Sequence, residues 1–288
     1  MSALDQPPNP ASDANSFTAS LSRFLLKAYH VRGVFIEAAP LIAEANRIHG
    51  LEGIPASLFG QVLLSSISLL SISKGGIRQV LQMDATQATD PVTRIQAETR
   101  PGMVRGYFNW NPSAQIKGGD DALLSSWMGS PIMTSTVRDP GFGSPYISTI
   151  EHGSDFIADH LVHYLQQSTQ IRADLALSGH NAIMIEAMPG CSETLWIQAL
   201  TALAAIDNAM LAEGNRELIF QTLAQGDCLQ LGKDMYRYQC LCNADSIITS
   251  LEAFSQEQLH ELADEHGEIT LSCQYCRKNY ITNVTGEK

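Results

Sequence analysis

Four of the six cysteines lie in two close pairs near the end of the 288-residue chain. Cys240 and Cys242 form a Cys-X-Cys pair, and after thirty residues (243–272) Cys273 and Cys276 form a Cys-X-X-Cys pair. Two such pairs on separate turns can place four thiolates about 2.3 Å from a Zn²⁺ ion with little backbone rearrangement. The spacing therefore predicts a Cys₄ zinc site with one ion per chain. The alternative, four unrelated thiols, leaves the paired spacing unexplained.

The segment between the pairs is expected to fold as a compact helical insert, with the second pair inside a hairpin. A unit of about fifty residues, 236–288, buries too little apolar surface to be stable alone. In small zinc domains the metal supplies on the order of 10 kcal/mol of folding free energy, so its removal should unfold the unit. The expected elements are a helix over Asn243–Leu251, a helix opened by a Ser255–Gln258 capping box, running through Leu262 and closed by Gly267, and strands at Glu268–Ser272 and Tyr280–Thr282.

A purely structural zinc site and an oxidation sensor both fit four cysteines, but two features favour a sensor. Zinc keeps its sulfur ligands as thiolates, which is the form of cysteine that oxidises. A disulfide across Cys240-Leu241-Cys242 closes a ring too tight for relaxed geometry, and a strained disulfide is easily reduced again. Cys191 and Cys228 lie outside the two pairs and are expected to be buried as small apolar side chains.

The length of the chain favours one large domain with smaller units. We predict an α+β fold in which a mostly antiparallel N-terminal sheet with helices is followed by a helical linker and a small C-terminal zinc-binding domain. The expected divisions are a flexible tail over residues 1–16, an N-terminal core over 17–190, a linker over 191–235 and a redox-switch domain over 236–288. Pro189-Gly190 marks the end of the core.

Hydrophobic periodicity and turn residues predict the elements of the N-terminal core and linker. Ser154 is expected to be the N-cap of a helix, and two helices are expected in the low-charge segment from Cys191 to Gln225. The expected helices are Phe17–Tyr29, Leu41–His49, Leu58–Ile72 with Pro55 in its first turn, and Ser154–Gln167; the expected strands are Val31–Ala38, Arg78–Met83, Thr93–Glu98, Val104–Trp110, Ile132–Val137 and Tyr146–Ile150, and a hairpin joins Asp174–Leu177 to Ala182–Met188.

The charge of the chain argues against a nucleic-acid partner. It carries 30 acidic and 18 basic side chains, a net charge of −12, which repels the phosphate backbone that such proteins must neutralise. The C-terminal segment 236–288 has four basic and eight acidic residues, which argues against a zinc ribbon that binds DNA or RNA.

No membrane partner is expected either. The apolar stretch Leu58–Ile72 is too short to span a bilayer and is interrupted by Gln61 and several serines, so it is predicted to be a buried helix. The first fifteen residues have no basic region followed by an apolar one, so the protein is expected in the cytoplasm.

Two histidine pairs have spacings that could bind a metal ion. His160 and His163 lie three residues apart near Asp155 and Asp159, but no second ligand pair accompanies them, so a solvated helix face is predicted. His260 and His266 can replace a thiolate in a zinc site, but four cysteines already complete a tetrahedron.

The cysteine motifs and their surroundings resemble the 33 kDa redox-regulated heat-shock chaperone family of bacteria. The resemblance is strongest in QCLCNADS and GEITLSCQYCRKNYI, which carry the two pairs, and covers most of residues 17–281. Further upstream it includes Val31-Arg32-Gly33, Val104-Arg105-Gly106-Tyr107 and IADHLVHYLQQSTQI, residues 157–171. It is weakest between Lys74 and Pro101, where this chain has MDATQATDP in place of a Gly-Asp-Gly type of turn, and Ser168-Thr169-Gln170 replaces Ser-Glu-Gln.

This resemblance implies an ATP-independent holdase, which is not an enzyme and binds unfolding client proteins. It implies that the reduced protein is zinc-bound and inactive, and that oxidation pairs Cys240 with Cys242 and Cys273 with Cys276. Zinc then leaves, the segment from Cys191 to about Arg237 loosens and exposes apolar surface, and the active protein dimerises.

A thiol-disulfide oxidoreductase that uses Cys273-Gln274-Tyr275-Cys276 is the main alternative function. Such enzymes carry the motif near a βαβ pattern, early in a thioredoxin-like fold, whereas here the motif is C-terminal and matched by a second pair.

Overall fold

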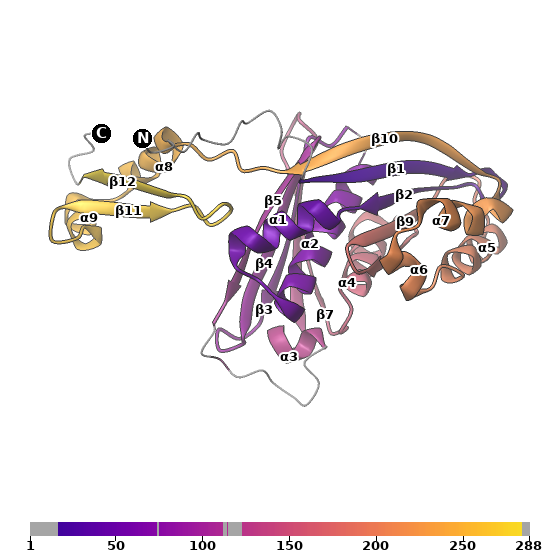
Figure 1. Cartoon of the computed structure of the whole chain (residues 1–288), viewed down its shortest axis with the longest axis horizontal. Helices are drawn as coiled ribbons and strands as arrows, with labels where there is room; N and C mark the ends of the chain where they lie inside the picture. Colours follow the sequence, from indigo (N-terminus) through magenta and orange to yellow (C-terminus); the bar gives the residue numbers. More distant parts are fainter. Residues whose placement is uncertain (1–16, 74, 112–113, 115–122, 284–288) are drawn as a thin grey trace, which may run out of the picture.

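A ten-stranded sheet with helices packed on it forms the body of the protein, and a small unit containing the C-terminal cysteines projects from one end (Figure 1). The structure, a computed structural model, describes residues 17–73, 75–111, 114 and 123–283. The expected tail over residues 1–16 lies outside the described residues. The mixed architecture confirms the predicted α+β fold.

The strands of the large sheet lie in the order β7-β6-β3-β4-β5-β10-β1-β2-β9-β8. All neighbours are antiparallel except β5 and β10, which pair in parallel over two residues each. All the strands expected between Val31 and Met188 are present. The bounds are β1 (Thr18–Leu26), β2 (Val31–Glu37), β3 (Arg78–Ala85), β4 (Val92–Arg100), β5 (Met103–Trp110), β6 (Ile132–Asp139), β7 (Tyr146–His152), β8 (Ala173–Ser178), β9 (Asn181–Ala187) and β10 (Cys228–Tyr238).

Helices cover both faces of the strands β1, β2 and β9. One face packs on α1 (Ala39–His49), α2 (Gly53–Ile72) and α4 (Ile157–Tyr164), and the other on α5 (Glu193–Ala204), α6 (Asn208–Glu213) and α7 (Arg216–Thr222). Side chains alternate between the two faces of a strand, so Val34 and Ile36 join the first core while Phe35 joins the second. This double burial explains the apolar run Val34-Phe35-Ile36 in the middle of β2.

The prediction of a helix over Phe17–Tyr29 is wrong, because residues 18–26 form strand β1. Ala19 and Leu21 face the α2 side, and Phe24 and Leu26, at the alternate positions of the strand, face the α5–α7 side. β1 lies between β2 and β10, and the sheet hydrogen bonds on both sides satisfy its backbone. A spacing of four residues is a multiple of the strand period of two, so this apolar pattern fits a strand as well as a helix.

Helix α2 lies across the middle of the sheet and confirms the predicted buried helix. It contacts β3, β4, β5 and β9. By length and composition alone it could cross a membrane, with a mean hydropathy of 1.5, but 72% of that window is buried inside the protein. Its apolar character therefore reflects its position in the core.

The helical segment after Gly190 contains three α-helices where two were expected. Asp207 accepts a hydrogen bond from the backbone of Met210 and begins α6, so the first expected helix is interrupted near Ala205. Strand β10 then follows, which periodicity did not predict, and joins the sheet between β1 and β5. The division of the chain at residues 190 and 235 remains a proposal, and β10 crosses the second boundary.

Two further helix ends differ from the expected positions. α4 begins at Ile157 and continues as a π-helical turn over Leu165–Thr169. Ser154 accepts a hydrogen bond from the Phe156 backbone nitrogen, so it lies before the helix and is not its N-cap. Helix α9 ends at Leu262, and Gly267, with a φ of 75°, belongs to the turn into the next strand.

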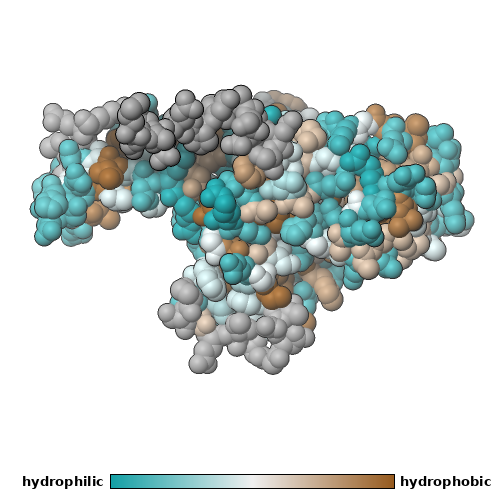
Figure 2. Space-filling model, viewed as in Figure 1, coloured by the Kyte–Doolittle hydropathy of each residue, from teal (hydrophilic) through white to brown (hydrophobic). Residues whose placement is uncertain are grey.

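The C-terminal unit has the elements that were predicted for it. It contains α8 (Ala244–Thr249), α9 (Gln256–Leu262), β11 (Glu268–Ser272) and β12 (Asn279–Asn283), and Ser255 and Gln258 form the expected capping box. Its own core is small: Leu251, Leu259 and Ile269 are its buried cluster. The surface of this unit is mostly hydrophilic, whereas the surface over α5–α7 mixes hydrophilic and hydrophobic residues (Figure 2).

Candidate metal centre

The structure brings the four predicted cysteines together. Cys240 and Cys242 follow the end of β10, and Cys273 and Cys276 lie in the turn between β11 and β12. All four sulfur atoms lie within 4.8 Å of one another. The Sγ atoms of Cys240 and Cys273 are 3.7 Å apart, and those of Cys242 and Cys276 are 3.3 Å apart. No other such group of metal-ligating side chains occurs in the described ranges.

These spacings fit a tetrahedral Cys₄ site. Four sulfurs about 2.3 Å from a central Zn²⁺ ion are about 3.8 Å from one another, which lies within the range seen here. Backbone hydrogen bonds fold the second pair into a tight turn: the nitrogen of Arg277 donates to the oxygen of Cys273 at 2.8 Å, and the nitrogen of Cys273 donates to the oxygen of Lys278 at 2.9 Å. Four clustered cysteines can therefore hold a metal ion.

The pKa values of the thiols show why a cation suits the cluster. Burial raises the pKa of Cys240 and raises that of Cys276 to about 12. Burial also opposes ionisation of Cys242, but hydrogen bonds from the Tyr280 hydroxyl, 3.1 Å away, and from the neighbouring thiols lower its pKa to about 7. Burial therefore opposes the ionisation of Cys240 and Cys276, and a bound cation would neutralise four thiolates that lie so close together.

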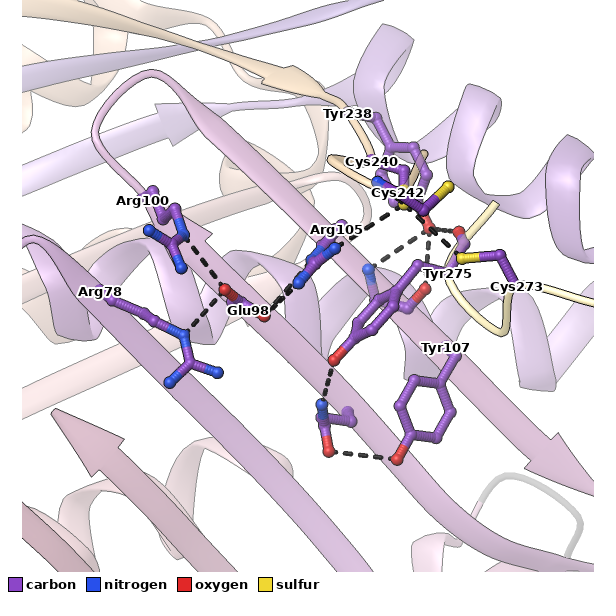
Figure 3. Close-up of polar contacts among 12 residues, drawn as sticks. Arg78, Glu98, Arg100, Arg105, Tyr107, Tyr238, Cys240, Cys242, Cys273 and Tyr275 are labelled. Carbon is purple, nitrogen blue, oxygen red and sulfur yellow. Dashed lines mark hydrogen bonds and ion pairs between the residues drawn. The ribbon is translucent and has the colours of Figure 1, made fainter. Parts of the chain in front are cut away.

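The side chain of Tyr275, between the second pair of cysteines, reaches the N-terminal sheet (Figure 3). Its ring lies 4.1 Å from the guanidinium carbon of Arg105 and makes an edge contact with Tyr107 at a centroid distance of 5.3 Å. Its hydroxyl accepts a hydrogen bond of 2.6 Å from the Gln96 side chain. Tyr275 therefore connects the cysteine turn to strands β4 and β5.

The backbone carbonyl of Tyr275 also contacts side chains of the N-terminal core and of β10. Its carbonyl oxygen lies 3.0 Å from the hydroxyl of Tyr238 and 3.2 Å from Nε2 of His49. Burial, with help from the positive charge of Arg277, lowers the pKa of His49 to about 4, so this histidine is neutral at pH 7. Tyr238 also contacts the backbone nitrogen and oxygen of Gly106, at 3.3 Å and 2.8 Å.

Arg105 links the cysteines to a buried carboxylate. Its Nη1 atom lies 3.7 Å from the sulfur of Cys240, and its Nη2 atom lies 2.8 Å from Glu98. Glu98 also pairs with Arg78 at 2.8 Å and with Arg100 at 3.2 Å, and its side chain is only 2% exposed (Figure 3). Burial opposes its ionisation, but the hydrogen bonds from Arg78 and Arg105 outweigh burial and lower the pKa of Glu98 to about 2.

Sequence reasoning missed the residues that surround Tyr275. Arg105 and Tyr107 lie in a segment noted for its family resemblance, but nothing in their spacing connects them to cysteines more than 130 positions away. Cys191 is buried as expected, and Cys228 is half-buried against the core under α5–α7.

The prediction of a solvated helix face for His160 and His163 is wrong, since His163 is half-buried with its ring stacked on His152 at a centroid distance of 4.5 Å. His160 does not lie on a solvated helix face: it is fully buried, with Nε2 2.9 Å from the oxygen of Ser154 and Nδ1 3.3 Å from the Thr134 hydroxyl. The helix bearing it packs on the sheet, which buries the side that the local sequence left polar. His260 and His266 take no part in the cysteine cluster.

Comparison with known proteins assigns the chain to a family. Its sequence matches the family described as "Hsp33 protein" over residues 19–283. The chain belongs to the Hsp33 family. Relatives named 33 kDa chaperonin include a Desulfotalea psychrophila protein, 24% identical with 90% of this chain and 92% of that protein covered, and a Deinococcus radiodurans protein, 28% identical with 87% and 90% covered.

A solved structure shows the same fold. The crystal structure of the 33 kDa chaperonin from Thermotoga maritima superimposes with a TM-score of 0.77 at 17% sequence identity, covering 94% of this chain and 96% of that one. The expected resemblance is therefore confirmed. Because Hsp33 proteins are chaperones, the expectation that the chain is not an enzyme is confirmed too, and the oxidoreductase alternative is set aside.

Proposed function

We propose that this Hsp33 protein is a redox-regulated, ATP-independent holdase, inactive when reduced and active when its four clustered cysteines are oxidised. The observation that carries the proposal is the cluster itself, in which four sulfurs lie within 4.8 Å of one another. Cys240, Cys242, Cys273 and Cys276 are the proposed ligands of one Zn²⁺ ion in the reduced state. Zinc, when bound, keeps the four sulfurs as thiolates and supplies folding free energy to the small unit around them.

Oxidation converts each cysteine pair into a disulfide. Two thiolates give up two electrons and form one S–S bond, while peroxide accepts the electrons and, with two protons, becomes two waters. The family resemblance pairs Cys240 with Cys242 and Cys273 with Cys276. After both reactions no thiolate remains in the cluster, and the remaining apolar core of Leu251, Leu259 and Ile269 is too small to keep the unit folded.

Loss of the unit's fold affects the helices α5–α7 through β10, which connects them to Cys240. β10 pairs with β1 along its length, but Tyr236 is its one buried side chain and pairing with β5 covers only its last residues. When β10 loosens, α5–α7 lose their attachment at one end. Their apolar side chains and the sheet residues that they cover then form a surface for unfolding clients; these include Trp196, Leu203, Leu211 and Phe220 on the helices and Phe24, Phe35 and Ile183 on the sheet.

The proposed partners are unfolding or oxidatively damaged proteins, and a second copy of the chain when oxidised. A cytoplasmic location is proposed because thiolate ligands need a reducing compartment until stress occurs. Neither a nucleic acid nor a membrane is proposed as a partner.

The test combines metal, thiol and aggregation measurements on the full chain. Peroxide with mild heat should release about one zinc per chain, produce the two disulfides in peptide mapping, and allow the protein to suppress light scattering by a heat-unfolding client. Cys240→Ser should weaken zinc binding, whereas Cys228→Ser, outside the cluster, should bind zinc like the wild type. Equal protection by the reduced and oxidised forms would exclude the proposed switch.

A further inference from the structure

The site that receives Tyr275 is built by the N-terminal sheet itself. Gln96 accepts a hydrogen bond of 3.1 Å from the Tyr107 hydroxyl, and Glu98 fixes the guanidinium of Arg105. We call the surface formed by Gln96, Arg105 and Tyr107 the tyrosine cup. Its three side chains lie on the face of β4 and β5 opposite α2, because Ile95, Ala97 and Val104 point into the α2 core.

The backbone of Tyr275 contacts the sheet at the point where strands β5 and β10 stop pairing with each other. β10 pairs with β5 only as far as Tyr238 opposite Val104, so the backbone of Gly106 has no strand partner on that side. The Tyr238 hydroxyl contacts both polar groups of Gly106 and also the carbonyl of Tyr275. The end of β10 and the cysteine turn are therefore joined at one point.

We propose that Tyr275 is an intramolecular latch: its side chain docks the cysteine unit in the tyrosine cup while the cysteines are reduced, and is withdrawn when they are oxidised. The docking stands on the contacts alone, and its regulatory meaning rests on the function proposed above. When Tyr275 is docked, its contact with Tyr238 keeps the end of β10 on the sheet. When Tyr275 is withdrawn, the end of β10 loses this contact.

Oxidation disturbs both sides of this contact. A disulfide between Cys273 and Cys276 needs an S–S distance of about 2.05 Å, so the turn that contains Tyr275 has to rearrange. A disulfide at Cys240 also removes the thiolate charge that faces Arg105, whose Nη1 is 3.7 Å from that sulfur. Both steps are the peroxide oxidations described above and need no further reactant.

The experiment measures amide hydrogen exchange in the full-length, reduced, zinc-loaded protein. Tyr275→Ala should speed exchange in the peptides that contain residues 105–107 and the end of β10 by about tenfold, the effect of losing one aromatic–guanidinium contact. Phe254→Ala is the matched control, because Phe254 is an aromatic residue of the same unit and is 44% exposed. It should leave those peptides unchanged.

A second variant approaches the latch from the sheet. Gln96→Ala removes the partner of the Tyr275 hydroxyl without touching the cysteine unit, so it should speed exchange in the same peptides while zinc content stays at one ion per chain. Tyr275→Phe combined with Gln96→Ala should then add little to Gln96→Ala alone, since both remove the same hydrogen bond. Wild-type exchange rates in Gln96→Ala and Tyr275→Ala would overturn the latch.

Oxidised wild-type protein decides whether the latch responds to redox state. Its exchange at residues 105–107 should match that of reduced Tyr275→Ala, and unchanged protection after peroxide would overturn the proposed release. Reduced Tyr275→Ala should also suppress client aggregation more than the reduced wild type does and less than the oxidised wild type does. If oxidised wild type protects no client, the proposed function fails, while the exchange measurements still decide whether Tyr275 docks in the cup.

Discussion

Glu98 shows at the scale of one residue how a buried charge can be stabilised. Three arginines contact its carboxylate, and its side chain is 2% exposed. An isolated carboxylate in such a position would protonate, but here the pKa falls to about 2 because Arg78 and Arg105 outweigh the cost of burial. The carboxylate therefore stabilises the fold at neutral pH and holds Arg105 in the tyrosine cup.

Replacing Glu98 by glutamine should lower the free energy of unfolding by about 2–3 kcal/mol at pH 7, since the arginines lose their counter-charge. The pKa of Glu98 is lower in the folded state than the value of about 4.3 in an unfolded chain. Its contribution is thus complete above about pH 4.3 and is lost as the pH falls to about 2. The difference between wild type and Glu98→Gln should disappear over this range.

Urea denaturation of the reduced, metal-free protein, followed by tryptophan fluorescence, measures this difference at each pH. Glu151→Gln is the control, because Glu151 is an exposed carboxylate on β7 of the same sheet. A stability difference for Glu98→Gln that stayed constant between pH 5 and pH 2 would contradict the assigned role of its charge.

At the scale of elements, α7 illustrates how the linker helices are attached to the sheet. The ring of Phe220 makes edge contacts with Phe24 of β1 and Phe35 of β2, at centroid distances of 5.6 Å and 6.3 Å. These aromatic contacts join α7 to two strands that also support the α2 core from their other face. Loss of the Phe220 ring should therefore loosen α5–α7 without disturbing α2.

Phe220→Ala is expected to reduce the free energy of unfolding by about 3 kcal/mol through loss of buried aromatic surface. Hydrogen exchange should become faster in α5–α7 and remain slow in α2. Leu218→Ala in the same helix serves as the control, because Leu218 is 38% exposed and should cost little. Equal acceleration of α2 and α7 would mean that the two helical layers unfold together.

At the scale of the whole molecule, a large core and a small C-terminal unit are joined by the segment that follows β10 (Figure 1). The sheet and its helices contain two extensive buried clusters, whereas the C-terminal unit has three buried apolar residues in its own cluster. Two parts so different in buried apolar surface should differ strongly in their dependence on a bound metal.

Removing the metal with a chelator under reducing conditions should unfold residues 240–283 and leave the ten-stranded sheet folded. Hydrogen exchange should become rapid in α8, α9, β11 and β12, while α2 and β9 keep their protection. Adding zinc back should restore the slow exchange. If the chelated protein kept its protection over 240–283, the unit would be stable by itself and the metal would have no structural role.

Local chemistry determined several features that can be predicted from the sequence alone. The spacing of the four cysteines, the capping box at Ser255, the apolar stretch of α2 and the turn at Gly179-His180 all depend on residues close together in the chain. These features are present in the structure as predicted, because the residues that specify a turn, a helix cap or a pair of ligands are neighbours in the chain.

Contacts between distant segments decided the rest. Residues 18–26 form a strand because β2 and β10 lie on either side of them, and the pairing with β10 joins Thr18 to Arg237. His160 is buried because its helix packs on the sheet. Tyr275 contacts Gln96 and Arg105 because β10 pairs beside β5 and so places the cysteine unit next to that strand. Hydrogen bonding and burial between such segments exist only in the folded chain, so no local pattern specifies them.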